Sequence, residues 1–241
     1  MSTSFIDMKD VGIQAVSHSR MKTHEGCPRK AMYKFVEKIK EPGNDAMNRG
    51  LEVHSGYEHW LLKHTGKPTD GKDGMLPVFP ISSVIEKDVK EYWDLPRAER
   101  YDIQAEQQVA FDKNWNVTSW FGPAAWMRVV FDSAFTSPNK EHIVLNDYKT
   151  GKVYDDHDDQ AELYAVAGRK MGAKKVNVKF YYMDQNTVQP YKFDENELDA
   201  LVDKIEARAL KVTSDRLFPT KPSWKCKWCF FSKQKGGKCA H

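Results

Sequence analysis

The segment VLNDYKTGK, Val144 to Lys152, constrains the fold more than any other stretch of this chain. Its first residues are apolar, which is typical of a buried β-strand, and a glycine follows as a turn signal. Because alternate side chains of a strand share a face, Ile143 and Leu145 are expected to point the same way. Asp147 and Lys149 continue that face. By itself this pattern is also explained by a surface ion pair at a fraying strand end.

A second acidic residue lies in an earlier apolar strand, WMRVVFDSAF, which contains Asp132. A hairpin through the turn-like SPNKE would bring Asp132 and Asp147 to one end of a sheet. Glu106, in IQAEQQVAF, is a third carboxylate nearby in sequence. Hard cations such as Mg²⁺ bind carboxylate oxygens, and a neighbouring lysine can position water or neutralise developing charge. Two carboxylates and Lys149 therefore suffice chemically to hydrolyse a phosphodiester bond.

The order FDSAF…VLNDYKTGK resembles the D…(D/E)-x-K motif of the PD-(D/E)XK nuclease superfamily, and more narrowly its RecB-type group. The resemblance extends over about residues 20 to 241. It implies an α/β (α+β) fold with a restriction-endonuclease-like core, in which a mixed central sheet is flanked by helices. It also implies that Asp132 and Asp147 bind Mg²⁺ or Mn²⁺, and that Lys149 is catalytic. Arg128 is a departure, because relatives often have glycine at that position.

Three flanking motifs extend the resemblance. RGLEVH implies that His54 is a metal ligand, and the backbone carbonyl of Tyr148 would be another. DQAELYA resembles the Q-x₃-Y motif, so Gln160 and Tyr164 are expected at the catalytic site, on one helix face. Glu106 matches a family glutamate near the metal. Taken singly, the histidine is more often a packed or surface residue, and the glutamine and tyrosine could simply cover a helix face.

Four cysteines are divided between the two ends of the chain: Cys27, Cys226, Cys229 and Cys239. Some RecB-type nucleases have one cysteine before the nuclease core and three after it. The resemblance to them implies that all four cysteines of this chain hold a [4Fe–4S] cluster. The gap before Cys239 is longer than in the family. The pattern also allows one structural Zn²⁺ held by the three tail cysteines and His241, with Cys27 as a spare thiol, or four free thiols.

The order of motifs predicts one nuclease domain over residues 1–241. It would comprise an N-terminal helical part (17–100), a nuclease core (101–215) and a C-terminal cysteine tail (216–241), with the metal cluster joining the two ends. Apolar periodicity predicts helices over 17–41, 48–64, 82–93, 156–171 and 194–212, and a loop over 67–80. Strands are predicted over 103–111, 118–135, 141–149, 175–184 and 188–193.

The net charge of +3 indicates little by itself. Lysine and arginine cluster in residues 19–40, 169–179 and 221–241, and such clusters suit a phosphate backbone, although each could be solvated surface charge. No apolar run is long enough for a membrane span, and the first residues do not resemble a signal peptide. We therefore expect a cytoplasmic protein that does not bind membranes.

These observations predict a divalent-metal-dependent deoxyribonuclease, an exonuclease acting on DNA ends or single strands in recombination, repair, phage DNA processing or CRISPR-type adaptation. No nucleotide-binding G-x₄-G-K-[ST] motif is present, so a helicase or recombination partner would be another chain. Trp115, Trp120 or Trp126 could stack on bases or pack in the core. Alternatives are a non-catalytic nucleic-acid-binding protein with a C-terminal zinc knuckle, and a nuclease-like subunit kept for assembly.

Overall fold

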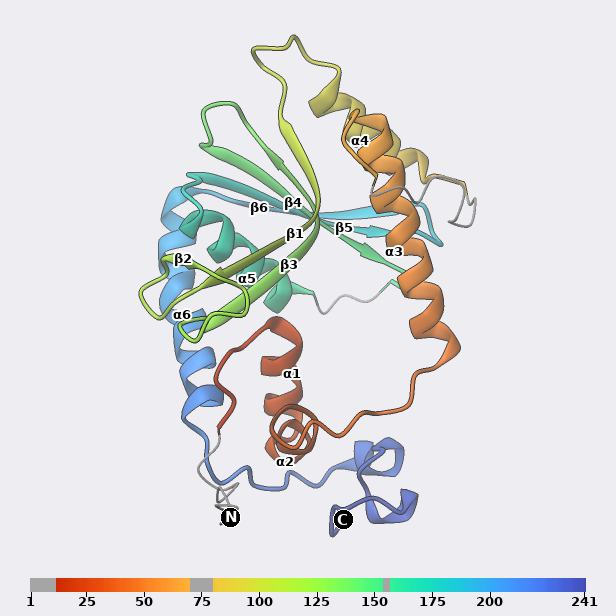
Figure 1. Cartoon of the computed structure of the whole chain (residues 1–241), viewed down its shortest axis with the longest axis vertical. Coiled ribbons are helices and arrows are strands. Elements are labelled where there is room, and N and C mark those ends of the chain that lie inside the picture. Colours follow the sequence, from red (N-terminus) through yellow and green to blue (C-terminus); the bar gives the residue numbers. More distant parts are fainter. Residues whose placement is uncertain (1–11, 70–79, 154–156) are drawn as a thin grey trace, which may run out of the picture.

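A six-stranded mixed sheet forms the centre of the molecule, with strand order β2-β1-β3-β4-β5-β6 (Figure 1). The computed structural model describes residues 12–69, 80–153 and 157–241. Strands β4 and β5 are parallel, and the other neighbouring strands are antiparallel. The strands are β1 (Asp102–Phe111), β2 (Val117–Thr118), β3 (Met127–Thr136), β4 (His142–Lys149), β5 (Lys175–Tyr182) and β6 (Thr187–Phe193).

In the described part of the chain, six α-helices surround or extend from the sheet. They are α1 (His18–Gly26), α2 (Pro28–Ala31), α3 (Asp45–His64), α4 (Ser83–Trp93), α5 (Asp158–Lys170) and α6 (Glu195–Ser214). A π-helical turn, Met32–Val36, continues α2, and two short 3₁₀ turns, Trp224–Trp228 and Lys233–Lys235, lie in the C-terminal tail. Helix α5 connects the two parallel strands, because a parallel pair requires a crossover connection.

The two faces of the sheet carry separate cores. Helices α5, α6 and α1 pack on one face, where Phe131 and Leu145 are fully buried. Helices α3 and α4 cover the other face around Val144 and Tyr148 (Figure 1). Successive residues of β4 point to opposite faces, so both faces of this central strand are buried. This matches the predicted mixed sheet flanked by helices.

Two predicted elements differ from the structure. The strand predicted over 118–135 is divided, because residues 119–126 form a loop between β2 and β3 that contains Gly122 and Pro123. The helix predicted over 17–41 ends at Val36 and is interrupted at Cys27, whose backbone is extended with φ −163° and ψ 108°. Pro28 then begins α2, since proline suits a first helical position but lacks the N–H needed to continue α1.

The segment before α1 extends the sheet next to β3. Val16 forms a parallel bridge with Met127, in which its N–H donates to Trp126 O and its carbonyl accepts from Arg128 N, both at 2.8 Å. Strand β4 pairs only with the other half of β3, from Ser133 onward. The part of β3 between these two contacts therefore has no neighbouring strand on the β4 side, which leaves an opening in the sheet.

The C-terminal tail returns to the N-terminal helices α1 and α2 (Figure 1). The N–H of Arg29 donates to Pro219 O at 3.2 Å, and the rings of Tyr33 and Phe231 lie 5.2 Å apart. Packing and hydrogen bonds thus join the two ends. Within the ranges described, no helix is both long and apolar enough to cross a lipid bilayer.

Candidate active site

The two aspartates of the D…D-x-K pattern lie where β3 and β4 separate. The last regular pair toward that end joins Ser133 to Asn146, so Asp132 and Asp147 come directly after it on their strands. The Asp132 carboxylate accepts a hydrogen bond from the backbone N–H of Tyr148. The Asp132 side chain thus accepts a hydrogen bond from β4 where the backbone of β3 no longer pairs with it. Both carboxylates are buried in the opening of the sheet.

Lys149 lies beside Asp147 on one face of β4, as the period of a strand predicts. Its Nζ is 2.6 Å from Asp147 Oδ1 and donates to Gln160 Oε1 at 3.0 Å. The same ammonium lies 5.2 Å from the centre of the Phe180 ring. These contacts hold the amine at one place beside the carboxylate.

Helix α5 supplies two polar side chains to the same aspartate. Gln160 Nε2 donates to Asp147 Oδ2 at 2.6 Å, and the Tyr164 hydroxyl lies 2.9 Å from that oxygen. Their spacing of one helical turn places them on one face, as predicted. Burial and the charge of Asp147 raise the pKa of Tyr164 well above its usual value, so the hydroxyl stays neutral. Both groups therefore fix the orientation of the Asp147 carboxylate.

His54 reaches the site from α3, on the opposite face of the sheet. Its Nδ1 lies 3.2 Å from Asp132 Oδ1, and its Nε2 lies 2.7 Å from the Tyr148 carbonyl oxygen. A carbonyl only accepts hydrogen bonds, so Nε2 carries a proton. Burial alone would lower the pKa of His54, but the hydrogen bond and charge of Asp132 outweigh it and raise the pKa to about 9. The imidazole is therefore protonated at neutral pH and donates to both oxygens.

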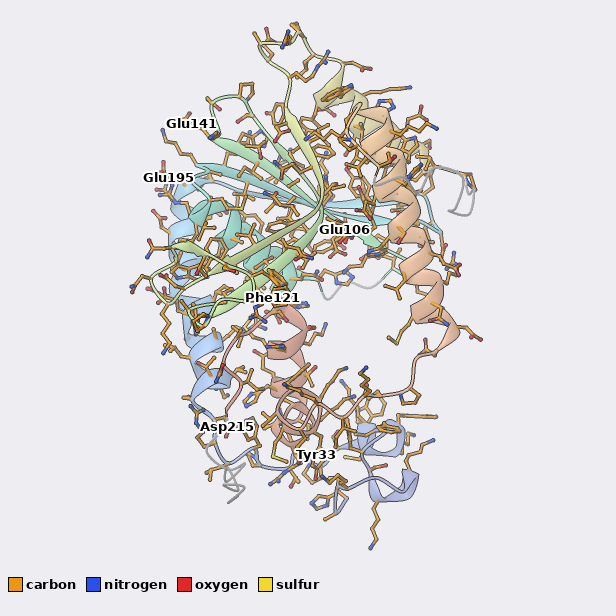
Figure 2. All side chains as sticks on the ribbon, viewed as in Figure 1. Tyr33, Glu106, Phe121, Glu141, Glu195 and Asp215 are labelled. Atoms are coloured by element: carbon orange, nitrogen blue, oxygen red, sulfur yellow. The ribbon has the colours of Figure 1, made fainter. Side chains whose placement is uncertain are left out.

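Glu106 lies directly opposite Asp132 on β1, although the residues on either side of it pair regularly with β3. Its φ of +46° is left-handed, a conformation that costs a side-chain-bearing residue about 1–2 kcal/mol. Burial and the charge of Asp132 raise the pKa of Glu106 to about 7. Figure 2 shows Glu106 between the central strands and α3. A strained backbone and opposed carboxylates are more typical of a functional site than of a stabilising contact.

A divalent cation fits this set of donors. The ligand atoms of His54, Glu106 and Asp132 lie within 4.8 Å of one another, and the Tyr148 carbonyl adjoins them through His54. The carboxylate and carbonyl oxygens suit Mg²⁺ or Mn²⁺, whereas an imidazole ligand is more typical of transition metals than of Mg²⁺. Burial and the negative charge of Asp147 raise the pKa of Asp132, so a cation would relieve repulsion there. Asp147 is outside the closest group, since its oxygens face the lysine of β4 and the side chains of α5.

All four cysteines line one pocket of about 420 Å³ between the N-terminal helices and the tail. Cys27 lies at the break between α1 and α2, and Cys226, Cys229 and Cys239 belong to the tail. Among the described residues, no three of the sulfurs lie within 4.8 Å of one another. The shared pocket agrees with the predicted proximity of Cys27, but the predicted metal cluster is not shown. Cysteine spacing could not decide this, because it does not fix how the sulfurs are oriented.

His18 also lies near this site, and sequence reasoning missed it. It stands at the start of α1, and its Nε2 is buried without a hydrogen-bond partner among the described residues. Burial and the charges of Lys22 and Lys149 lower the pKa of His18 to about 4. No motif surrounds this histidine, and only the packing of α1 against α5 brings it close.

A comparison with protein families identifies one match. The model of the PD-(D/E)XK nuclease superfamily matches residues 15–234, which include every site residue described above except Cys239 and, in the zinc alternative, His241. No curated protein sequence matches the chain.

Two bacterial proteins are among the solved structures to which this chain is similar. A candidate exonuclease from Eubacterium rectale has a TM-score of 0.50 at 14% identity, with 100% of this chain and 94% of that chain covered. The alkaline exonuclease of Laribacter hongkongensis has a TM-score of 0.41 at 11% identity, with 87% and 91% covered. At such identity, the first likeness shows the fold alone.

Proposed function

Because the chain belongs to the PD-(D/E)XK nuclease superfamily, we propose that it is a divalent-metal-dependent deoxyribonuclease that hydrolyses phosphodiester bonds. The observation that carries this proposal is the convergence of two buried carboxylates with a half-buried lysine and a half-buried imidazole in the opening between β3 and β4. Two aspartates, one lysine and one histidine from three separate elements meet there. A surface ion pair at a strand end would not require this burial.

Metal binding is proposed for His54, Asp132 and Glu106, whose ligand atoms lie closest together, with the Tyr148 carbonyl and the adjacent Asp147 carboxylate as further ligands. When bound, Mg²⁺ or Mn²⁺ supplies positive charge that activates water and neutralises charge on the phosphate. His54 must first release the proton that it carries, because a metal-binding histidine is neutral. The binding of metal is therefore expected to release a proton.

The chain's own catalytic groups are Lys149, Gln160 and Tyr164. Lys149 is held at one face of Asp147, where it can orient the attacking water or stabilise the charge that develops on the phosphate. Gln160 and Tyr164 both contact Asp147 Oδ2 and so keep this carboxylate in one orientation. Positioning of this kind matters because small displacements of reacting groups lower the rate steeply.

The proposed substrate is DNA with a free end or a single-stranded region, degraded exonucleolytically. Support comes from the solved structure that overlaps the whole chain, which is described as a candidate exonuclease. A helicase or recombination protein as partner stays a prediction from the sequence, as does the choice among recombination, repair, phage DNA processing and CRISPR-type adaptation.

A [4Fe–4S] cluster held by Cys27, Cys226, Cys229 and Cys239 is also proposed. Four thiols at one pocket support it, since four cysteines are the usual ligands of such clusters. A four-iron cluster is larger than a single ion, so its thiolates stand farther apart than those around one zinc. The zinc alternative uses the three tail cysteines and His241, which lines the same pocket.

The cleavage of labelled DNA tests the main proposal. Purified protein with Mg²⁺ or Mn²⁺ should shorten end-labelled linear single- or double-stranded DNA, and EDTA should stop the reaction. Asp147→Asn, purified in parallel, should be inactive while keeping the wild-type circular dichroism spectrum. A covalently closed circle should resist if the activity requires an end. Equal activity in wild type and Asp147→Asn would reject the assigned site, and binding without cleavage would favour the non-catalytic alternative.

A further inference from the structure

A groove of about 430 Å³ opens beside the candidate active site. Its walls are the start of α1, the first half of β3, helix α5 and the loop between β2 and β3. Gln160 and Tyr164 line the groove and also contact Asp147. The groove therefore leads directly to the place where the phosphodiester bond is proposed to be cut.

Two arginines in this groove lack acidic partners. Arg20 and Arg128 both line it, and neither forms an ion pair with a carboxylate in the part of the chain that the structure describes. Burial and the positive charge of Arg128 lower the pKa of Arg20, so the two guanidinium groups are near enough to repel. The Nε of Arg128 is buried and has no hydrogen-bond partner among the described residues. An anion such as a phosphate would offset this repulsion and accept hydrogen bonds.

An aromatic surface adjoins these charges. Trp120 lines the groove, and the guanidinium of Arg128 lies 5.7 Å from the centre of its ring. The next residue, Phe121, is 87% exposed on the same loop, where Figure 2 labels it. Aromatic side chains beside arginines bind single strands, because each base can stack on a ring while the cation contacts the backbone. A base within a duplex is already stacked and paired, so such a groove favours an unpaired nucleotide.

His18 adds a polar group that can contact a base. It lines the groove, and its low pKa keeps the imidazole neutral at physiological pH. A neutral imidazole presents one donor and one acceptor nitrogen. Its Nε2 is buried without a protein partner in the described residues, so the ring must turn toward the groove before this nitrogen can contact a nucleotide.

We propose that this groove is a subsite for one unpaired nucleotide of the DNA strand, adjacent to the phosphodiester that is cut. Trp120 stacks on the base, Arg20 and Arg128 bind a phosphate, and His18 contacts the base edge. The assignment rests on the proposed nuclease function for the position of the scissile bond, but binding of the single strand can be measured without cleavage. The consequence is that the enzyme takes a single strand to its active site.

Binding in EDTA tests the groove independently of catalysis. The probe is a short fluorescein-labelled oligodeoxythymidine, and the measurement is its fluorescence anisotropy. Trp120→Ala should weaken binding about tenfold, the usual effect of losing one base–aromatic stack. A backbone of abasic nucleotides should bind wild type and Trp120→Ala equally. Arg128→Gln should reduce the slope of log Kd against log salt by about 0.7, the value for one phosphate contact on a single strand.

The chain offers a matched control. Trp93 is half-buried like Trp120, and the guanidinium of Arg100 lies 4.6 Å from its ring centre, but this pair is on α4 and the segment after it. Trp93→Ala and Arg100→Gln should leave the affinity and its salt slope unchanged. Trp120→Phe should retain most of the affinity, which separates lost stacking from misfolding.

The outcomes separate the two proposals. If wild type cleaves DNA but Trp120→Ala and Arg128→Gln bind and cleave like wild type, the subsite is rejected and the nuclease assignment stands. If wild type never cleaves, yet these variants lose affinity while the controls do not, the groove binds a single strand and the nuclease assignment fails. If groove and control variants weaken binding equally, the loss is general and the subsite is rejected.

Discussion

The amine of Lys149 lies 2.6 Å from a carboxylate oxygen of Asp147, two residues earlier on the same strand. This contact follows directly from the spacing of side chains within one strand. The lysine cannot move far from this position, because it also donates to Gln160. Its charge is thus fixed next to the proposed metal and phosphate.

Replacing Lys149 should affect the chemical step more than DNA binding. Lys149→Ala removes a positioned positive charge, and the loss of one such group costs roughly 10²- to 10³-fold in kcat. The affinity for uncleaved DNA in EDTA should change little. Lys152→Ala, a nearby exposed lysine, serves as the control and should keep its kcat. Weak binding with normal kcat at saturation would make Lys149 a phosphate contact only.

Glu106 should make stability depend on pH in the metal-free protein. Its folded pKa of about 7 is above the ordinary value of 4.5, so the folded state retains a proton that the unfolded chain releases. Stability should therefore fall as the pH rises from about 4.5 to about 7, and Glu106→Gln should reduce this fall, leaving the smaller share that comes from the raised pKa of Asp132. The urea midpoint measured in EDTA across this range gives the answer. Glu99→Gln, at an exposed position, should behave like wild type.

His54 should make stability fall at higher pH. Its folded pKa of about 9 exceeds the ordinary value of 6.5, so its contribution is fully present below pH 6.5 and is lost as the pH rises through 9. Wild type in EDTA should lose stability over that interval. His54→Gln should lose much less, while His64→Gln, on the same helix, should follow wild type. Identical urea midpoints for wild type and His54→Gln at each pH would contradict the hydrogen bond between the imidazole and Asp132.

The cysteine pocket gives a prediction with a visible signal. Protein purified without oxygen should be brown and contain about four irons per chain, and Cys27→Ser should lose colour and stability as Cys226→Ser does. The zinc alternative gives a colourless protein that tolerates Cys27→Ser but is damaged by His241→Ala. Metal analysis of these three variants separates the two. A colourless wild type with neither metal would leave the thiols free.

Short-range parts of the site could be predicted from the sequence. The period of a strand places Asp147 with Lys149, and the period of a helix places Gln160 with Tyr164. The approach of His54 to Asp132 could not be derived this way, because it depends on how α3 packs on the sheet. Only the resemblance to a known family predicted it.

Other features of the structure could not be predicted from local sequence patterns, because they depend on turns and on tertiary packing. Residues 119–126 are rich in aromatic residues, which favours a strand, but Gly122 and Pro123 make the segment a loop. The groove beside the site depends on the position of α1, which tertiary packing decides. The four cysteines were predicted to hold one metal cluster; they line one pocket, but the cluster itself is not shown. The arrangement of their sulfurs depends on local turns and on any bound metal, which residue spacing does not specify.

The short bridge between Val16 and Met127 protects the molecule from pairing with other chains. Without it, the start of β3 around Met127 would be an exposed strand edge, a known starting point for aggregation. A chain shortened to begin at α1 would keep every proposed catalytic residue and lose this protection. A shortened version of the protein should therefore begin before Val16, so that the bridge to β3 is kept. A tag attached there must leave residues 15–17 free to pair with β3.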